Sequence, residues 1–283
     1  MSRTGLSLAF LAGVLGFLLM AGLAWHLFGQ DDTLARVRDG SPLRIGYAVE
    51  APYALVDRSG RVTGEAPEIA RQMAERLGIT QIEWRQVEFG QLIEALRAGE
   101  IDVIAAGLYV TPERARLVRF SRPTLRVDPG LLVARGNPKA LSTYRDVLAR
   151  RDVRIAVLAG AVEESLVRRA GLPEQRLRVV PDASTGRQAV AAGLADALLL
   201  SRPTVRWMAH QASLVDTEAV APATPEGAEG LHATTAFAFR KADGPLARAW
   251  DTALAGYLGG PEHLALLRRF GLGPDTLPAR NTP

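Results

Sequence analysis

Residues 107–121 read Gly-Leu-Tyr-Val-Thr-Pro-Glu-Arg-Ala-Arg-Leu-Val-Arg-Phe-Ser and follow a short apolar run at 102–106. The apolar run predicts a buried strand that ends where the quoted stretch begins. Thr111 suits the N-cap of a following helix, and Pro112 suits its first helical position. The pattern therefore places Arg114 just beyond the C-terminal end of a strand, where open α/β sheets bind their ligands.

Arg114 in this position suits the binding of a carboxylate. Its guanidinium can donate two parallel charged hydrogen bonds, beside the Thr111 hydroxyl and the amides at the helix start. A first-turn arginine can also remain in solvent and pair with Glu113 or Glu68, and such surface pairs are common. The residues alone leave both interpretations open.

The composition indicates a globular protein with enough apolar residues for a packed core. Of the 283 residues, 48% are hydrophobic and 23% are charged, and this length allows one large or two modest domains. The net charge is +4, but the arginines are scattered among acids, so we expect no nucleic-acid partner. Cysteine is absent and the four histidines show no paired ligand spacing, so we expect no disulfide, metal site or cofactor.

The N-terminal segment predicts export from the cytoplasm. Arg3 precedes an almost uninterrupted apolar run at 6–28, and two aspartates follow at 31–32, so the positive-inside rule sends the remainder outward. The run is longer than the usual signal-peptide core of about 7–15 residues and is long enough to span a bilayer. We therefore expect a signal peptide or N-terminal membrane anchor at 1–30 and a linker at 31–42.

Beyond the linker, strands and helices alternate in two successive series. Such alternation predicts a parallel sheet covered by helices in each series. The first series comprises strands at 43–47, 81–88 and 101–106 and helices at 67–77 and 91–97. The second comprises strands at 129–135, 153–158, 177–180 and 196–200 and helices at 144–149, 162–170, 185–193 and 202–210. The expected order ends with a loop at 211–231, a strand at 234–239 and helices at 244–257 and 261–270.

An acid and three aromatic residues are expected at the same sheet edge as Arg114. Glu50 and Tyr53 follow the first strand, Phe89 follows the next long strand, and Tyr109 lies in the quoted stretch. Because the C-terminal ends of parallel strands converge, these side chains can form a cage for a delocalised cation. Each ring can instead be ordinary core packing, and Glu50 a solvated loop acid. Their coincidence with Arg114 favours a small zwitterionic ligand.

The quoted stretch also carries a family resemblance. Gly107, Thr111-x-Glu113-Arg114 and Phe120-Ser121 resemble the core motif of the family 3 extracellular solute-binding proteins, which are receptors of ABC importers for amino acids and related small zwitterions. The resemblance runs from about residue 42 to residue 272. It implies a non-enzymatic, monomeric receptor of the periplasm that delivers its solute to an ABC permease, with Arg114 holding the ligand carboxylate.

The resemblance also implies an architecture. It is the α/β two-lobe periplasmic-binding-protein fold (type II), in which two parallel-type sheets with helices are joined by a two-strand hinge and ligand binds between the lobes. In this sequence, residues 43–133 and 234–275 would form a discontinuous first lobe, and residues 134–233 the second. The residues alone predict two α/β units; the crossing of the chain between them is what the resemblance implies.

Three segments narrow the resemblance to the members of that family that bind ectoine or hydroxyectoine. These segments are Glu50-Ala-Pro-Tyr53, 63–70 and 105–114. The matched motifs assign the cyclic amidinium to Glu50 and the three aromatic residues, and the carboxylate to Arg114. In the second lobe, Ser201 stands where amino-acid receptors of the family place an aspartate for the α-ammonium, which disfavours a standard amino acid. The expected ligand contacts are Glu50, Tyr53, Phe89, Tyr109, Thr111, Arg114, Gly160, Ala161, Val162 and Ser201.

Other solutes and one class of enzyme remain compatible with these residues. A betaine, a proline-like solute or a polar amino acid fits the same cleft, because the second-lobe contacts match less securely than the first. Cyclohexadienyl and arogenate dehydratases resemble the family, and they would need a general acid, for which Glu163 or Glu164 is the candidate. A membrane-anchored sensor is a further alternative.

Overall fold

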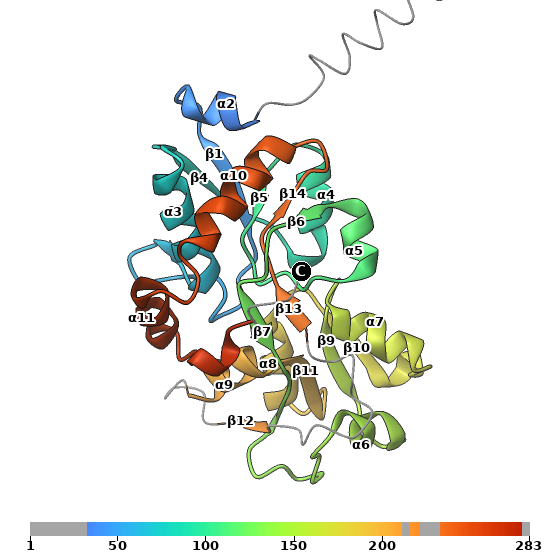
Figure 1. The fold of residues 1–283 in the computed structure, drawn as a ribbon. Helices are drawn as coiled ribbons and strands as arrows, with labels where there is room; N and C mark the ends of the chain where they lie inside the picture. Colours follow the sequence, from blue (N-terminus) through green and yellow to red (C-terminus); the bar gives the residue numbers. More distant parts are fainter. Residues whose placement is uncertain (1–32, 211–215, 221–232, 279–283) are drawn as a thin grey trace, which may run out of the picture.

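The computed structural model describes residues 33–210, 216–220 and 233–278 as two helix-covered sheets (Figure 1). The expected signal peptide or anchor at 1–30 lies outside these residues. Within the described ranges, no helix combines the length and apolar character that crossing a bilayer requires.

Five strands form the first sheet: β1 (Leu43–Tyr47), β4 (Ile82–Gln86), β5 (Val103–Ile104), β6 (Arg119–Phe120) and β14 (Ala238–Phe239). Their order is β4-β1-β5-β14-β6. β1 runs parallel to both of its neighbours, with Ile45 opposite Trp84 on one side and Val103 on the other. β14 is antiparallel to both of its own neighbours. The expected parallel arrangement is therefore confirmed, with one antiparallel strand inserted by the returning chain.

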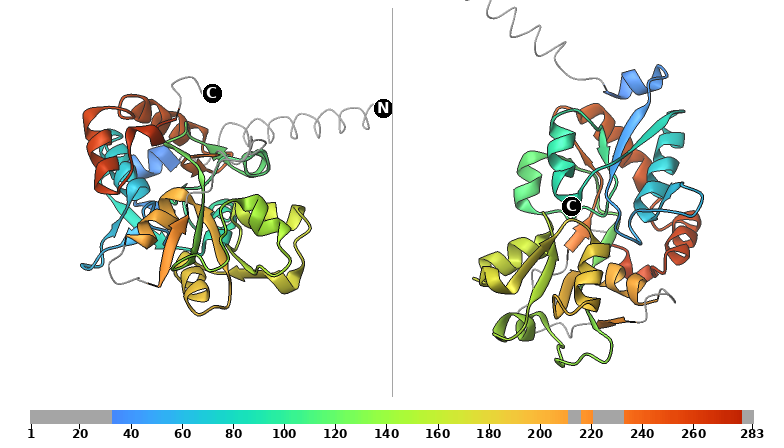
Figure 2. Two further views of the ribbon diagram at one scale, coloured as in Figure 1. Left: turned by 90° about the horizontal axis from the view of Figure 1, so that it is seen from below. Right: turned by 180° about the vertical axis from the view of Figure 1, so that it is seen from behind.

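The helices around this sheet include two from the end of the chain (Figure 2). Trp250 is fully buried and packs edge-to-face on Phe237 and Phe239, with ring centroids 5.2 and 5.7 Å apart. This aromatic cluster holds the C-terminal helices to the first lobe. The helices are α3 (Glu65–Arg76), α4 (Leu92–Arg97), α5 (Pro112–Leu117), α10 (Gly244–Ala255) and α11 (Pro261–Arg269), and a hairpin of β2 (Leu55–Val56) and β3 (Val62–Thr63) precedes α3.

The second sheet contains β8 (Pro129–Ala134), β9 (Ile155–Leu158), β10 (Leu177–Val180), β11 (Ala197–Ser201) and β12 (Thr217–Val220), in the order β10-β9-β11-β8-β12. β9 is parallel to both neighbours, whereas β8 is antiparallel to both of its own. Its helices are α6 (Tyr144–Ala149), α7 (Val162–Arg169), α8 (Ala183–Ala191) and α9 (Arg202–Ala209).

The expected loop at 211–231 is wrong where β12 lies. Residues Thr217–Val220 pair with β8 and form the edge of the second sheet. A four-residue edge strand carries little apolar alternation, so its pairing depends on the exposed backbone of β8 more than on its own sequence. The pattern along the chain therefore gave no signal for it.

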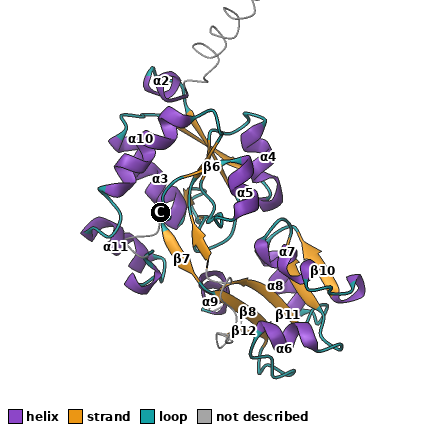
Figure 3. Cartoon of the chain, turned by 45° about the vertical axis from the view of Figure 1, so that its right-hand side comes forward, coloured by secondary structure: helices purple, strands orange, loops and turns teal. Residues whose placement is uncertain are grey.

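Two extended segments connect the lobes and confirm the two-strand hinge. β7 (Leu125–Val127) runs between the sheets in Figure 3 and pairs antiparallel with β13 (Ala233–Thr235). Because β8, which follows β7 directly, is hydrogen-bonded into the second sheet, we propose a lobe boundary near Asp128 in place of residue 133.

The expected linker at 31–42 is also wrong in part, because α2 (Thr33–Arg38) is a helix docked on the first lobe. Arg36 of this helix donates to Asp102 at 2.8 Å. The Asp102 side chain is fully buried and also binds Arg44 at 2.7 Å and Arg240 at 3.0 Å. Burial alone would raise the pKa of Asp102, but the hydrogen bonds from these arginines outweigh it and hold the pKa at about 2.

Asp102→Ala should lower the free energy of unfolding by about 3 kcal/mol, because it leaves three converging guanidinium groups without their buried acceptor. The contribution of Asp102 is present above its unfolded pKa of about 3.9 and is lost as the pH falls through its folded pKa. Urea unfolding at neutral pH measures the effect. Glu94→Ala removes an exposed pair with Arg97 and should cost less than about 1 kcal/mol. Equal effects of the two variants would contradict this account of the cluster.

Candidate ligand-binding cleft

The structure gathers most of the expected site residues where the two lobes face each other. Loops after β1, β4 and β5 meet the starts of α7 and α9 around a cavity of about 20 Å³, which we call the cleft cavity. Of the expected contacts, those that line it are Glu50, Phe89, Tyr109, Arg114, Ala161, Val162 and Ser201. The remaining expected residues, Tyr53, Thr111 and Gly160, hydrogen-bond to lining residues.

Arg114 bridges the lobes. The Thr111 side chain caps α5 by accepting a hydrogen bond from the Arg114 amide at 3.2 Å, which fixes the start of the helix. The guanidinium donates from Nη1 to the Tyr109 carbonyl at 3.0 Å and from Nη2 to the Gly160 carbonyl at 2.8 Å. Its carbon lies 5.7 Å from the ring centroid of Phe89. Backbone carbonyls of both lobes therefore occupy donors that would hold a carboxylate.

A chain of hydroxyl groups also connects the two lobes across the cleft. Tyr53 donates from its hydroxyl to Ser201 Oγ at 2.9 Å, and Ser201 lies 3.0 Å from the Thr204 hydroxyl. Thr204 then donates to Glu50 Oε1 at 2.8 Å. Tyr53 and Glu50 belong to the first lobe, and Ser201 and Thr204 to the start of α9 in the second. These bonds exist only while the lobes are closed.

Tyr53 lies beneath the cleft cavity and not in its wall. Its ring packs under Gly107, where a Cβ atom would come within 2.5 Å of the ring. Gly107 has a φ of 62°, a conformation that favours glycine. The close approach of the Tyr53 ring and the backbone conformation therefore both require glycine at this position. Among the described residues, the rings that line the cavity are therefore Phe89 and Tyr109, and the expected cage of three rings has two in this structure.

Two buried carboxyl groups face the cleft cavity. Burial raises the pKa of Glu50 to about 7, against the hydrogen bond from Thr204 and the charge of Arg114, which lower it. Burial also raises the pKa of Glu163 to about 7, and the Glu50 charge adds to the rise. Near neutral pH, both groups hold a proton for part of the time. A cation that enters the cavity would favour their ionised forms.

Glu163 was expected only as an alternative general acid, and the structure places it in the cavity wall. Its signal in the sequence was its position in the first turn of a helix after a strand, which it shared with Glu164. Glu164 instead accepts a hydrogen bond from the Gly160 amide at 2.8 Å and pairs with Arg168. Thr204 was missed altogether, although it follows Ser201 by three residues and so shares its helix face.

Two larger cavities share lining residues with the cleft cavity. A cavity of about 630 Å³ shares Glu50 and Phe89 with it, and one of about 530 Å³ shares Tyr109 and Glu163. The cleft cavity itself has room for about one water molecule. A small zwitterion therefore needs the lobes to move apart before it can enter between them.

The chain is similar to known proteins over most of its length. Residues 43–270 match the bacterial extracellular solute-binding proteins, family 3. A probable amino-acid ABC transporter periplasmic-binding protein of Sinorhizobium fredii is 30% identical over 96% of this chain and 89% of its own. EhuB in complex with hydroxyectoine aligns with a TM-score of 0.76 at 31% identity, covering 86% of this chain and 93% of that one. The ancestral amino acid-binding protein AncCDT-1, a precursor of cyclohexadienyl dehydratase, gives a TM-score of 0.74 at 26% identity, covering 84% and 99%.

The pH dependence of the free energy of unfolding should reflect the titration of Glu50 and Glu163. Because their folded pKa values lie above the unfolded value, they contribute stability at low pH that is lost as the pH rises from about 4.3 to the folded value. Glu163→Gln in the ligand-free protein should therefore lose less stability between pH 5 and pH 8 than the parent, by on the order of 2 kcal/mol. Urea unfolding at both pH values measures this difference.

Glu164→Gln is the matched control, since its carboxylate pairs with Arg168 outside the cleft cavity. This variant should keep the pH dependence of the parent. If Glu163→Gln also keeps the pH dependence of the parent, Glu163 does not exchange a proton in the closed cleft.

Proposed function

Because the chain belongs to family 3 of the bacterial extracellular solute-binding proteins, and is therefore a solute-binding receptor of an amino-acid-type ABC importer, we propose that its solute is ectoine or hydroxyectoine. The chain has the type II two-lobe fold of that family. We place the mature protein in the periplasm, where it would hand the closed, loaded form to a permease.

One observation carries the choice of solute. Arg114 and Glu50 line the same small cavity, and the rings of Phe89 and Tyr109 line it with them. The groups match a molecule with a carboxylate at one end and a delocalised cation at the other. Ectoine is a cyclic amidine with a carboxylate. The likeness to EhuB, whose structure holds hydroxyectoine, supports the same choice.

The carboxylate would bind Arg114 in place of a backbone carbonyl. In the closed structure, Nη2 of Arg114 donates to the Gly160 carbonyl, which belongs to the second lobe. When the lobes separate, that donor loses its partner, and a ligand carboxylate can accept from it. Closing the second lobe onto the bound carboxylate would then add the amides at the start of α7, near Ala161 and Val162.

The amidinium would lie against the rings and beside Glu50. A delocalised cation has a lower desolvation cost than a primary ammonium and binds well on ring faces. Thr204 donates to one carboxylate oxygen of Glu50, which leaves the other for the ligand. Entry of the cation would lower the pKa of Glu50 and hold the group ionised. The binding of ligand and the closing of the Glu50–Thr204 contact would therefore support each other.

A second candidate function rests on Glu163. This residue is buried in the cavity wall with a pKa raised to about 7, which suits a general acid that acts at neutral pH. The likeness to AncCDT-1, a precursor of cyclohexadienyl dehydratase, adds to this candidate. Incubating the protein with prephenate or arogenate and following the aromatic product by absorbance tests it. Turnover that Glu163→Gln abolishes would favour the enzyme over the receptor.

Arg114→Lys should weaken ectoine binding by about tenfold or more, although the charge is kept, because the planar fork that holds a carboxylate is lost. Isothermal calorimetry on the purified protein measures the affinity. Arg122→Lys is the control, since Arg122 is an exposed residue of the same lobe that lies near Asp251. An unchanged affinity in Arg114→Lys would remove this residue from the site.

Phe89→Ala and Tyr109→Ala together should cost about 3 kcal/mol of ectoine binding, because each removes a ring from the cavity wall. In a displacement assay, ectoine should out-compete glutamine and arginine, whose primary ammonium groups need several directed acceptors. If glutamine or arginine displaces ectoine, the receptor assignment survives and the solute is an ordinary amino acid.

A further inference from the structure

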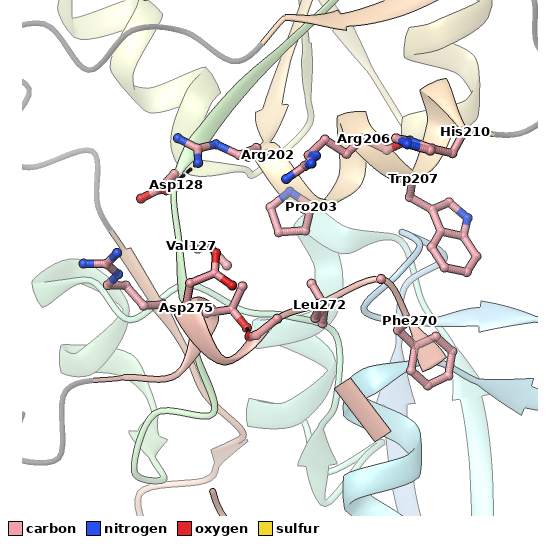
Figure 4. A pocket seen from close by; sticks show the side chains of 14 residues that line it. Val127, Asp128, Arg202, Pro203, Arg206, Trp207, His210, Phe270, Leu272 and Asp275 are labelled. Atoms are coloured by element: carbon pink, nitrogen blue, oxygen red, sulfur yellow. Dashed lines mark hydrogen bonds and ion pairs between the residues drawn. The ribbon is translucent and has the colours of Figure 1, made fainter. Parts of the chain in front are cut away.

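A further cavity lies at the hinge, beside β7. It measures about 350 Å³, and we call it the hinge cavity. Figure 4 shows side chains of α9, among them Arg206 and Trp207, on one side of it and Leu272 and Asp275 of the C-terminal segment on the other. The hinge strand β7 contributes Arg126 to its lining.

The walls of the hinge cavity come from both lobes. α9 packs on β8, β11 and β12 of the second sheet, whereas the C-terminal segment follows α11, which packs on α3 of the first lobe. The two walls meet where Trp207 lies 6.3 Å from Phe270 between ring centroids. A change in the angle between the lobes would move these walls relative to each other, so the cavity has this shape only in the closed form.

The chemistry of the lining favours an anion with a flat apolar body. Arg202 pairs with Asp128 at 3.1 Å. Arg126 and Arg206 are exposed residues, and their guanidinium groups have no hydrogen-bond or ion-pair partner in the described part of the chain. Three arginines face two carboxylates in the lining, so the balance is positive. Trp207, Phe270 and Leu272 supply the apolar surface on which a ring can lie.

The hinge cavity and the cleft share the helix α9. Ser201 and Thr204 at its start bind Tyr53 and Glu50 across the cleft. Trp207, further along the same helix, lines both the hinge cavity and the cavity of about 630 Å³ that shares Glu50 and Phe89 with the cleft cavity. A molecule that fixes α9 against the C-terminal segment would therefore also hold the cleft contacts of this helix in place.

We propose that the hinge cavity is a second binding site, for a small aromatic carboxylate, and that its occupation favours lobe closure. The carboxylate is held by Arg206, and the ring lies against Trp207 and Leu272. Because both sites are complete only in the closed form, each ligand raises the affinity for the other by the same factor. The existence of the site does not depend on which solute the cleft binds.

Calorimetric titration with three probes tests the site. Benzoate carries both ring and charge, benzamide keeps the ring without the charge, and acetate keeps the charge without the ring. Benzoate should bind saturably, and its affinity should be about tenfold or more higher than that of benzamide or acetate. Binding of benzamide as tight as that of benzoate, or no saturable binding of benzoate, would overturn the proposal.

Variants locate the probe. Arg206→Gln should weaken benzoate binding by about tenfold or more, whereas Arg145→Gln, an exposed arginine of α6, should leave it unchanged. Because benzoate also offers a carboxylate to the cleft, Arg114→Gln is measured beside them. Benzoate binding that is lost in Arg114→Gln and kept in Arg206→Gln would place the probe in the cleft and overturn the proposal.

The coupling is read from the affinity for ectoine with and without saturating benzoate. Benzoate should tighten ectoine binding by about fivefold or more in the parent and have no such effect in Arg206→Gln. Saturable benzoate binding without this change would overturn the coupling. If ectoine itself does not bind, the proposed solute is wrong. The titrations with benzoate, benzamide and acetate then still test the hinge cavity directly.

Discussion

A half-buried guanidinium that bridges two lobes is the interaction on which the cleft depends. Arg114 donates to the carbonyls of Tyr109 in one lobe and Gly160 in the other. Burial lowers the pKa of Arg114 while the nearby Glu163 charge raises it, but a guanidinium stays charged at any physiological pH. A charge that cannot be neutralised needs an acceptor in every state of the protein. In this structure the two backbone carbonyls accept its hydrogen bonds, and in the proposed open form a ligand carboxylate would take the place of the Gly160 carbonyl.

The two acids complete this balance of charge. Glu50 and Glu163 belong to different lobes, and both line the cavity that Arg114 lines. With one fixed cation and two groups that can gain or lose a proton, the closed cleft can adjust its net charge to its contents. A zwitterion leaves the total charge unchanged but redistributes it, with its cationic end beside an acid. The same cavity can therefore suit a charged solute.

Much of the fold could be predicted because it depends on local patterns. Thr111, Pro112 and Arg114 mark a helix start by capping rules, and the structure has α5 at that place with the Thr111 cap formed. The exceptions depend on contacts that no local pattern encodes. α2 is docked on the first lobe by contacts with distant residues, among them the ion pair between Arg36 and Asp102. β12 is a strand because the edge of β8 is available to it.

In the cleft, too, local patterns predict some residues, whereas the placement of others depends on contacts between distant parts of the chain. The sequence motif gave the positions of Arg114 and Glu50, since strand ends converge on one sheet edge. It could not show that Tyr53 would lie under Gly107, because that depends on the space between two loops. Nor could it choose Glu163 over Glu164, which occupy adjacent positions on α7 and point to different surroundings. The direction of the side chain on one turn of helix decides which acid faces the cleft cavity.

A crystal structure of the protein grown with ectoine tests the central claim most directly. The account predicts electron density for the solute between the lobes, with its carboxylate on the Arg114 guanidinium and its amidinium beside Glu50 and the rings of Phe89 and Tyr109. Density with the carboxylate turned away from Arg114, or a closed cleft that remains without solute at saturating ectoine, would contradict it.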